Sequence, residues 1–318
     1  MDSIKPIIEP VEKSKLEAEL TKERFVRNTN KGGNKIYDFA GNEAPNLMRE
    51  VGRLREESFR QAGGGTGKEA DIDDYDLAEV PYRQLIVWDP EEKEILGGYR
   101  YIMGNTIPRD ENGNVKLATS RLFHFSQKFL DEFFPHTIEL GRSFVQPQYQ
   151  SSKHGAKSLF ALDNLWDGLG SLIVNNPEMK YFFGKVTMYT HFNQEARDLI
   201  LSFMNKYFRD KDKLVYPLDE FKVKIGLSDE KVKEIFKGPT FVEDYKILNR
   251  MVRELGESIP PLVNAYMNLS PSMRSFGTAV NDRFGDVEET GIIITINEFN
   301  KAKTERHVET YNPNDTHE

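Results

Sequence analysis

Apolar and polar positions follow two different periods along the chain, and the change between them marks the expected elements. Residues 35–39 alternate as a short strand does, and Pro45 then opens a run with helical spacing. The apolar positions of that run include Leu47, Met48, Val51, Leu54 and Phe59. The pattern predicts a strand followed by an amphipathic helix.

Strand-like runs recur through the next hundred residues. Residues 84–88 and 95–103 predict two strands joined by a turn that begins with Asp-Pro. A short helix over 126–133, capped by Ser126, leads into a further strand over 138–145.

Helical spacing is more frequent in the second half of the chain. Residues 157–175 are apolar nearly all round, which predicts a buried helix, and residues 182–188 predict the next strand. Further elements are expected as helices from Asn193 to about 207, over 228–237 and over 242–255, and as a last strand over 292–296.

This alternation of strands and helices predicts the α/β (α+β) class. With 318 residues, 38% of them hydrophobic, the chain can bury one large core, which we place at residues 34–300 with a helical segment at about 207–258. Residues 1–33 predict a charged helical appendage, and residues 301–318 predict a polar, loose tail.

Charge and cysteine content narrow the function classes. A formal net charge of −8 does not favour broad nucleic-acid binding, and Cys 0 excludes a disulfide, a thiolate metal site and a cysteine nucleophile. No metal site is expected. No run approaches the roughly 20 apolar residues that span a bilayer, and the first residues lack the regions of a signal peptide. We expect a cytoplasmic protein and leave peripheral contact with the inner membrane open.

Candidate chemistry centres on the strand over 138–145. It sets Glu139 and Arg142 three residues apart, so in a regular strand the two side chains would point to opposite faces. Gly141 between them favours a bulge that would bring them to one side, and a bulge beside a carboxylate indicates an active site. The alternative is a surface ion pair on an edge strand.

A loop rich in glycine and aspartate precedes these strands. Residues 63–68 are not a phosphate loop, because Ala62 and Glu69 occupy positions that the motif reserves for Gly and for Ser or Thr. A mobile lid or an acceptor-side loop is the better interpretation. The acidic run that follows can bind a cation or pair with arginines, and its residues are Asp71, Asp73, Asp74 and Asp76. Arg100, flanked by apolar and aromatic residues in its strand, needs such a carboxylate partner if it is buried.

Several motifs, taken in order, resemble a known family. They are Leu54-Arg55 with Ser58-Phe59, the Asp73/Asp76 pair, Gly97-Gly98-Tyr99-Arg100, residues 139–149, residues 165–169, Ile259-Pro260-Pro261-Leu262, Ala265-Tyr266 and Asp282-Arg283-Phe284. Their order and spacing resemble those of the GNAT-like acyltransferases that use acyl carrier protein: the acyl-homoserine lactone synthases and the hemolysin-like ornithine-lipid synthases. In length and in the segment 207–258, the chain is similar to the glycine-lipid N-acyltransferases of gut Bacteroidota.

The resemblance implies a fold and a reaction. The fold is a mixed, mostly antiparallel sheet, splayed at a bulged central strand, with helices on both faces. The reaction moves a 3-hydroxylated fatty acyl group from acyl carrier protein to the α-amine of an amino acid, with glycine favoured, in bacterial aminolipid biosynthesis. No permanently bound cofactor is implied, since the donor is the acyl-phosphopantetheine of the carrier protein.

The resemblance also assigns roles to residues. Glu139 would be the general base with Arg142 as its electrostatic partner, in one charged cluster completed by Asp73, Asp76, Arg100 and Arg55. The pantetheine loop of ordinary GNAT enzymes is represented only by residues 150–156, so Gly155 and Ala156, with Phe144 and Val145, are the expected donor-binding residues. An acyl tunnel could be lined by Phe160, Leu165, Trp166 and Leu169, for which plain core is the alternative, and Phe59 is a further expected substrate-binding residue.

Other functions remain open at this point. Ornithine as acceptor would need a carboxylate for its distal ammonium, which Asp71 to Asp76 could supply. A catalytically silent module that binds acyl carrier protein or a lipid is the second alternative, and a homoserine-lactone synthase is the third.

Overall fold

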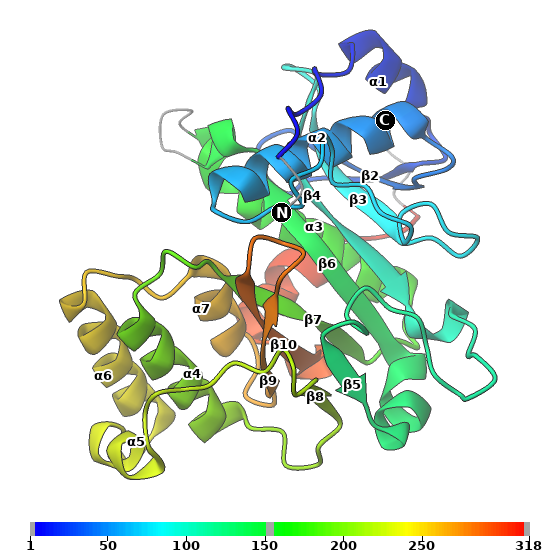
Figure 1. The fold of residues 1–318 in the computed structure, drawn as a ribbon. Helices are drawn as coiled ribbons and strands as arrows, with labels where there is room; N and C mark the ends of the chain where they lie inside the picture. The colour runs from blue at the N-terminus through cyan, green and yellow to red at the C-terminus, as the bar shows by residue number, and fades with distance from the viewer. Residues whose placement is uncertain (1–3, 151–155, 315–318) are drawn as a thin grey trace.

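One eight-stranded sheet organises the molecule (Figure 1), with its strands in the order β1-β2-β3-β4-β6-β7-β10-β9. The computed structural model describes residues 4–150 and 156–314, without the side chains of 156–159. The strands are β1 (Phe25–Asn28), β2 (Lys35–Ala40), β3 (Arg83–Asp89), β4 (Glu94–Met103), β6 (Thr137–Val145), β7 (Tyr181–Met188), β9 (Arg274–Asn281) and β10 (Val287–Thr295). Strands β5 (Phe123–Phe125) and β8 (Val215–Pro217) pair separately.

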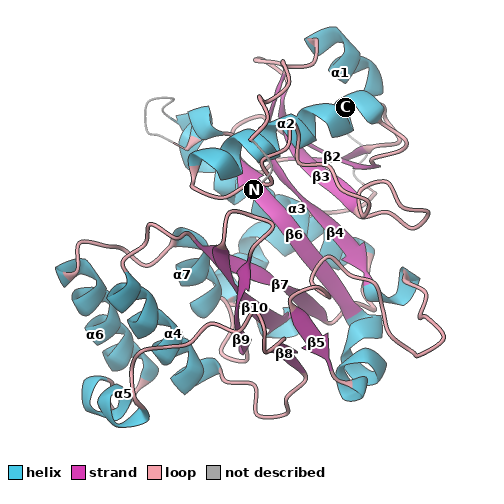
Figure 2. Cartoon of the chain, in the orientation of Figure 1, coloured by secondary structure: helices cyan, strands magenta, loops and turns pink. Residues whose placement is uncertain are grey.

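Helices lie on both sides of this sheet (Figure 2). The α-helices are α1 (Lys13–Glu19), α2 (Pro45–Gln61), α3 (Ala156–Asn175), α4 (Gln194–Phe208), α5 (Asp229–Ile235), α6 (Phe241–Glu254), α7 (Pro261–Met267) and α8 (Lys301–Lys303). The predicted caps are confirmed at Asn193, which accepts from the backbone N–H groups of Glu195 and Ala196, and at Ser126, which accepts from Phe129. The mixed sheet with helices on both faces confirms the predicted fold class.

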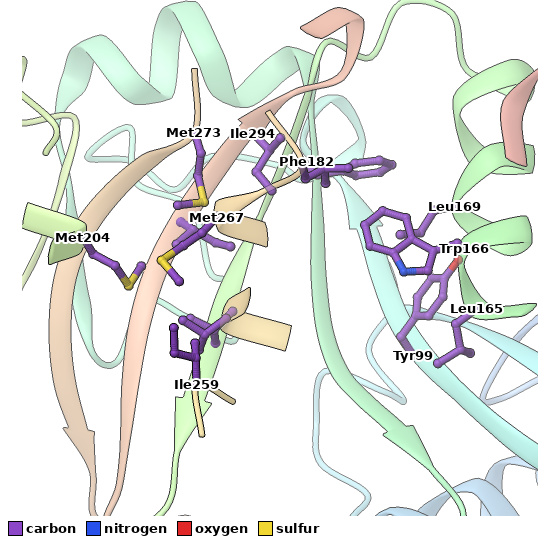
Figure 3. Packing of buried hydrophobic residues seen from close by; sticks show 14 of the residues in the cluster. Tyr99, Leu165, Trp166, Leu169, Phe182, Met204, Ile259, Met267, Met273 and Ile294 are labelled. Atoms are coloured by element: carbon purple, nitrogen blue, oxygen red, sulfur yellow. The ribbon is translucent and has the colours of Figure 1, made fainter. Parts of the chain in front are cut away.

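Helices α2 and α3 cover opposite faces of β3. Gln84 on this strand bonds Arg55 of α2, whereas its neighbour Leu85 touches Gly168 of α3 so closely that a Cβ there would lie 2.5 Å from the Leu85 side chain. Successive residues of a strand point to opposite faces. Figure 3 shows Leu165, Trp166 and Leu169 packed against Tyr99 on the α3 side.

The central strands β6 and β7 are parallel, and they separate part-way. Their register runs from Thr137 opposite Tyr181 to Leu140 opposite Gly184, and the remaining residues of the two strands are not paired with each other. Beyond that point β6 continues along β4, and β7 continues along β10. The sheet therefore splays at β6, as the resemblance implied.

The bulge predicted in this strand is present on β6. Arg100 of β4 lies opposite Gly141 and Gly98 lies opposite Phe144, so two residues of β6, Arg142 and Ser143, face the single residue between Gly98 and Arg100. Arg142 has φ +52°, a conformation that costs a non-glycine residue free energy. The bulge therefore redirects the chain where β6 leaves β7.

Both ends of the chain differ from expectation. The long N-terminal helix is only α1, and β1 is hydrogen-bonded to β2 as part of the sheet. The prediction of a loose C-terminal tail is wrong for residues 301–308. His307 is buried, and its Nδ1 lies 2.7 Å from Asp167 Oδ1 on α3. The division into appendage, domain and tail stays a prediction.

The helical segment after β7 packs against α4 rather than against the sheet centre. Phe203 of α4 contacts the rings of Phe236 and Phe241, and Lys206 and Tyr207 both reach the buried Asp244 of α6. The two helices predicted here are confirmed as α5 and α6. No helix among the residues described is long and apolar enough to cross a membrane.

Candidate active site

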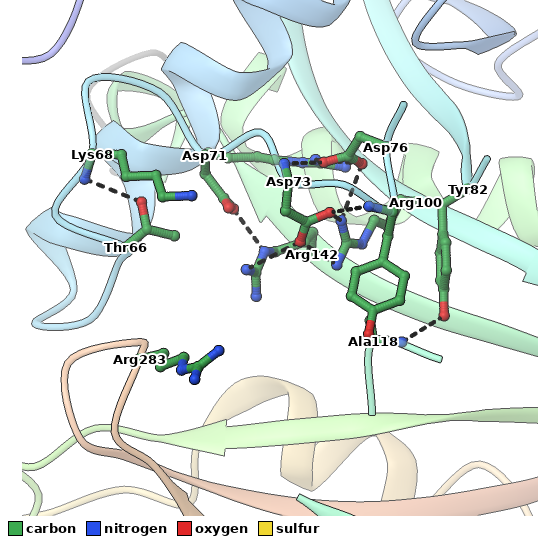
Figure 4. A network of polar contacts seen from close by, with 12 residues as sticks. Thr66, Lys68, Asp71, Asp73, Asp76, Tyr82, Arg100, Ala118, Arg142 and Arg283 are labelled. Carbon is green, nitrogen blue, oxygen red and sulfur yellow. Dashed lines mark hydrogen bonds and ion pairs between the residues drawn. The ribbon is translucent and has the colours of Figure 1, made fainter. Parts of the chain in front are cut away.

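Arginines and aspartates from four segments meet where β6 leaves β7 (Figure 4). Arg100 on β4 lies 2.8 Å from Asp73 and 3.1 Å from Asp76, and Arg55 on α2 lies 3.3 Å from Asp76. Arg142 on the bulge lies 2.7 Å from Asp71. The carboxylate partner expected for a buried Arg100 is confirmed, and so is the pairing of the acidic run with arginines.

The electrostatics of this cluster follow from its burial. Burial alone would raise the pKa of Asp76, but Arg55 and Arg100 outweigh it and hold that pKa well below its usual range. The carboxylates of Asp76 and Asp73 raise the pKa of Arg100, although the burial of Arg100 acts in the opposite direction. Asp76 and Arg100 are therefore charged at neutral pH, and each has partners that offset its desolvation.

The loop before the cluster is fixed to α2. Glu56 is fully buried, and its carboxylate accepts hydrogen bonds from the backbone N–H groups of Thr66 and Gly67 and from the Thr66 hydroxyl. Further along, Ile72 lies against Gly52, where a Cβ would meet its side chain at 2.5 Å. Glycine at position 52 thus lets the loop approach α2 and deliver Asp71 and Asp73 to the arginines.

Glu139 does not pair with Arg142, so that expectation was wrong. The Glu139 carboxylate accepts a 2.5 Å hydrogen bond from the Tyr82 hydroxyl, which itself accepts one from the Ala118 N–H at 3.0 Å. Glu139 precedes the bulge, whereas Arg142 lies within it at positive φ, and the loop carrying Asp71 supplies the nearer carboxylate.

The surroundings of Glu139 suit a proton acceptor. Its side chain is buried, and this burial raises the pKa of the carboxyl, against the lowering effects of the Tyr82 hydrogen bond and the charge of Lys185. A carboxylate with a raised pKa takes up a proton more readily near neutral pH than an exposed one does.

Sequence reasoning missed several buried polar residues on the strands next to Glu139. Lys185 on β7 lies 2.5 Å from Glu289 on β10, and Asn281 on β9 donates to the same carboxylate at 3.0 Å. Tyr82, just before β3, was missed as well. A signal for Lys185 was its place two residues after the buried Phe183, which puts both side chains on one face of the strand.

The expected donor-binding and substrate-binding residues are divided between two hydrophobic clusters. Phe59 and Phe144 share one cluster with Phe284, whereas Trp166 and Leu169 belong to the cluster on the α3 face of the sheet, together with the side chain of Val145. Phe160 is partly buried beneath the ammonium of Lys31. Gly155 and the side chain of Ala156 lie outside the described residues. Leu165, Trp166 and Leu169, three of the proposed tunnel residues, share the cluster on the α3 face, and their lining of a tunnel stays a prediction.

Comparison with known proteins now decides the family. Residues 54–158 match the acetyltransferase (GNAT) domain. A glycine N(alpha)-acyltransferase of Bacteroides thetaiotaomicron is 57% identical over 96% of this chain and 90% of its own length, and one of Phocaeicola vulgatus is 56% identical over 96% and 93%. The chain belongs to the glycine N(alpha)-acyltransferase family.

Membership in this family makes the chain an N-acyltransferase, with an acyl donor and an amine acceptor. The resemblance stated from the sequence is confirmed. A solved CoA-dependent acyl-homoserine lactone synthase, with SAM and isopentyl-CoA bound, aligns over 86% of this chain and 87% of its own at 10% identity and a TM-score of 0.36, which is too low to support an argument.

Proposed function

We propose that this enzyme transfers a 3-hydroxylated fatty acyl group from acyl carrier protein to the α-amine of glycine, in the cytoplasm, for aminolipid biosynthesis. The observation that carries the acceptor is the identity of more than half the residues with two proteins named glycine N(alpha)-acyltransferase, over nearly the whole chain. The carrier-protein donor and the hydroxylated chain rest on the motifs of the acyl-carrier-protein branch.

The reaction requires two functions of the protein, which are proton removal and stabilisation of an oxyanion. The neutral amine attacks the thioester carbonyl carbon, the C–S bond breaks, and the pantetheine thiolate leaves. The enzyme has to remove a proton from the ammonium and stabilise the oxyanion that forms on the carbonyl oxygen.

The site provides a group for each task. Glu139, with its raised pKa, is the proposed base and acts through a water, since its side chain is buried. The bulge at Arg142 interrupts the ladder between β4 and β6, and a backbone N–H of this bulge is the proposed donor to the thioester oxygen. Arg55, Asp73, Asp76 and Arg100 hold the acceptor-side loop against the sheet.

The contacts of the acidic run favour glycine over ornithine. Ornithine would bring a second ammonium, and three of the four carboxylates of the acidic run are already paired: Asp71 with Arg142, and Asp73 and Asp76 with Arg100. Glycine has no side chain and needs no such partner.

Two experiments test this function. Mass spectrometry of lipids from a bacterial host that expresses the enzyme should show a new N-(3-hydroxyacyl)glycine, and its absence would contradict the proposal. Calorimetric titration with 3-hydroxyacyl carrier protein, alongside a turnover assay, separates an enzyme from a silent module. Binding without turnover would identify the module, and turnover with coenzyme A thioesters alone would exclude the carrier protein as donor.

A further inference from the structure

Two cations near the charged cluster have no partner in the part of the chain that is described. Among the residues that the structure describes, neither the Lys68 ammonium nor the Arg283 guanidinium makes a hydrogen bond or an ion pair. In Figure 4 both side chains extend toward Arg142, Lys68 from the loop after α2 and Arg283 from the hairpin between β9 and β10.

Packing fixes these two segments against each other. A Cβ on Gly285 of the hairpin would lie 3.0 Å from Gly64 Cα, so the hairpin touches the glycine loop directly. Next to Arg283, the ring of Phe284 packs edge-on to Phe59 at 5.1 Å and lies under the Arg142 guanidinium at 4.3 Å. The backbone at Arg283 is therefore held beside the cluster by its neighbour in sequence.

The three aspartates of the cluster are committed to its arginines. Arg55, Arg100 and Arg142 are matched by Asp71, Asp73 and Asp76. The carboxylate beside Arg283, Asp282, is paired with Arg121. An anionic group that approaches Lys68 and Arg283 would meet positive charge that the aspartates of the cluster do not neutralise, while Arg55, Arg100 and Arg142 would stay committed to those aspartates.

Glycine consists of an amine and a carboxylate, so an enzyme that prefers it to a simple amine must recognise the carboxylate. We propose that Arg283, assisted by Lys68, binds the carboxylate of the acceptor and so orients its amine toward the donor thioester. This inference rests on the proposed function. A guanidinium suits the task, since it can donate two parallel hydrogen bonds to one carboxylate.

The test is steady-state kinetics of Arg283→Ala with glycine and with glycinamide, which keeps the amine and removes the negative charge. The KM for glycine should rise about tenfold or more, the scale of a lost charge-assisted contact. The KM for glycinamide and for the acyl donor should stay unchanged, and Arg283→Lys should recover part of the loss. Lys68→Ala should act in the same direction with a smaller effect.

A matched control is Arg250→Ala, which removes another exposed arginine, on α6, and should leave all three KM values unchanged. An unchanged glycine KM in Arg283→Ala would overturn the inference, as would a rise in the donor KM alone, which would assign Arg283 to the donor phosphate. If the wild-type enzyme acylates another amino acid but not glycine, the proposed acceptor is wrong. The comparison of that amino acid with its amide as acceptor then still tests whether Arg283 binds the carboxylate. If the wild-type enzyme acylates no amine, the inference falls with the proposed function.

Discussion

The Tyr82 hydroxyl donates a hydrogen bond to Glu139 over 2.5 Å, and both side chains are buried. The donor on Tyr82 is positioned by a second hydrogen bond from the Ala118 backbone to the phenolic oxygen. A carboxylate in this position is oriented and partly desolvated before substrate arrives. This pair, rather than an ion pair with Arg142, defines the candidate base.

Replacing Glu139 with Gln should keep the shape and the Tyr82 contact while removing the proton acceptor. Turnover should fall by about 10²–10⁴-fold, the usual contribution of a general base. In the wild type, kcat/KM should fall as pH decreases through the pKa of Glu139, which burial raises above the ordinary range for Glu. This acidic limb should be absent from the variant.

Stability against pH gives an independent readout of the same residue. A carboxyl whose folded pKa is raised stabilises the fold fully at low pH and loses that contribution as pH rises through the folded pKa. Glu139→Gln should remove this loss. A variant with a rate within about threefold of wild type, far short of the general-base range, would take Glu139 off the catalytic list.

Asp76→Asn should destabilise the fold strongly, because it leaves Arg55 and Arg100 short of a buried counter-charge. The loss in free energy of unfolding should be about 3–5 kcal/mol, as for other broken buried pairs. Since Arg55 and Arg100 lower the pKa of Asp76, its contribution should be present at neutral pH and disappear only as pH falls through that lowered value.

Denaturant unfolding at several pH values would measure this effect, with Asp131→Asn as the control. Asp131 pairs with Arg109 on the surface, so its replacement should leave the free energy of unfolding unchanged. Equal losses in the two variants would mean that the cluster is not buried as described.

Arg142 allows the effect of the backbone to be separated from that of the charge. Arg142→Ala and Arg142→Gly both remove the guanidinium, but only glycine adopts φ +52° without strain. The free energy of unfolding of the Gly variant should therefore be about 1 kcal/mol higher than that of the Ala variant. An Ala variant at least as stable as the Gly variant would argue against the bulge at this residue.

Truncation tests the contact of the C-terminal segment with α3. A chain that stops after Glu309 keeps the pair of His307 with Asp167, and it should melt near the full-length protein. A chain that stops after Phe299 loses that pair and the hydrogen bond from Arg27 to the His307 carbonyl, and should lose at least about 1–3 kcal/mol. Equal stability of the two truncated chains would show that the segment contributes nothing.

Local patterns were enough to predict much of this fold. The periods of β2, α2, β3 and β4 are regular, and Gly141 indicated irregularity beside Arg142, where the bulge lies. Arg100 was recognised as a buried charge because apolar and aromatic residues flank it. Such features depend on neighbours in sequence, which is why a single chain reveals them.

Features set by long-range packing could not be predicted in this way. The partner of Arg142 is Asp71 because the loop after α2 folds back over β6, and the partner of Glu139 is Tyr82 from another strand end. His307 looked like part of a polar tail, and only its contact with Asp167, 140 residues earlier, buries it. Strand β9 carries few β-formers and is held by pairing with β10.

A competition reaction tests the central claim most directly. Purified enzyme would be mixed with 3-hydroxyacyl carrier protein and equal concentrations of glycine and ornithine, and the amides would be quantified by mass spectrometry at early time points. If the enzyme acylates glycine with Glu139 as the general base, N-acylglycine should be the main product, and the Glu139→Gln variant should lose this product. N-acylornithine as the main product, or no amide from enzyme that binds the carrier protein, would contradict the account.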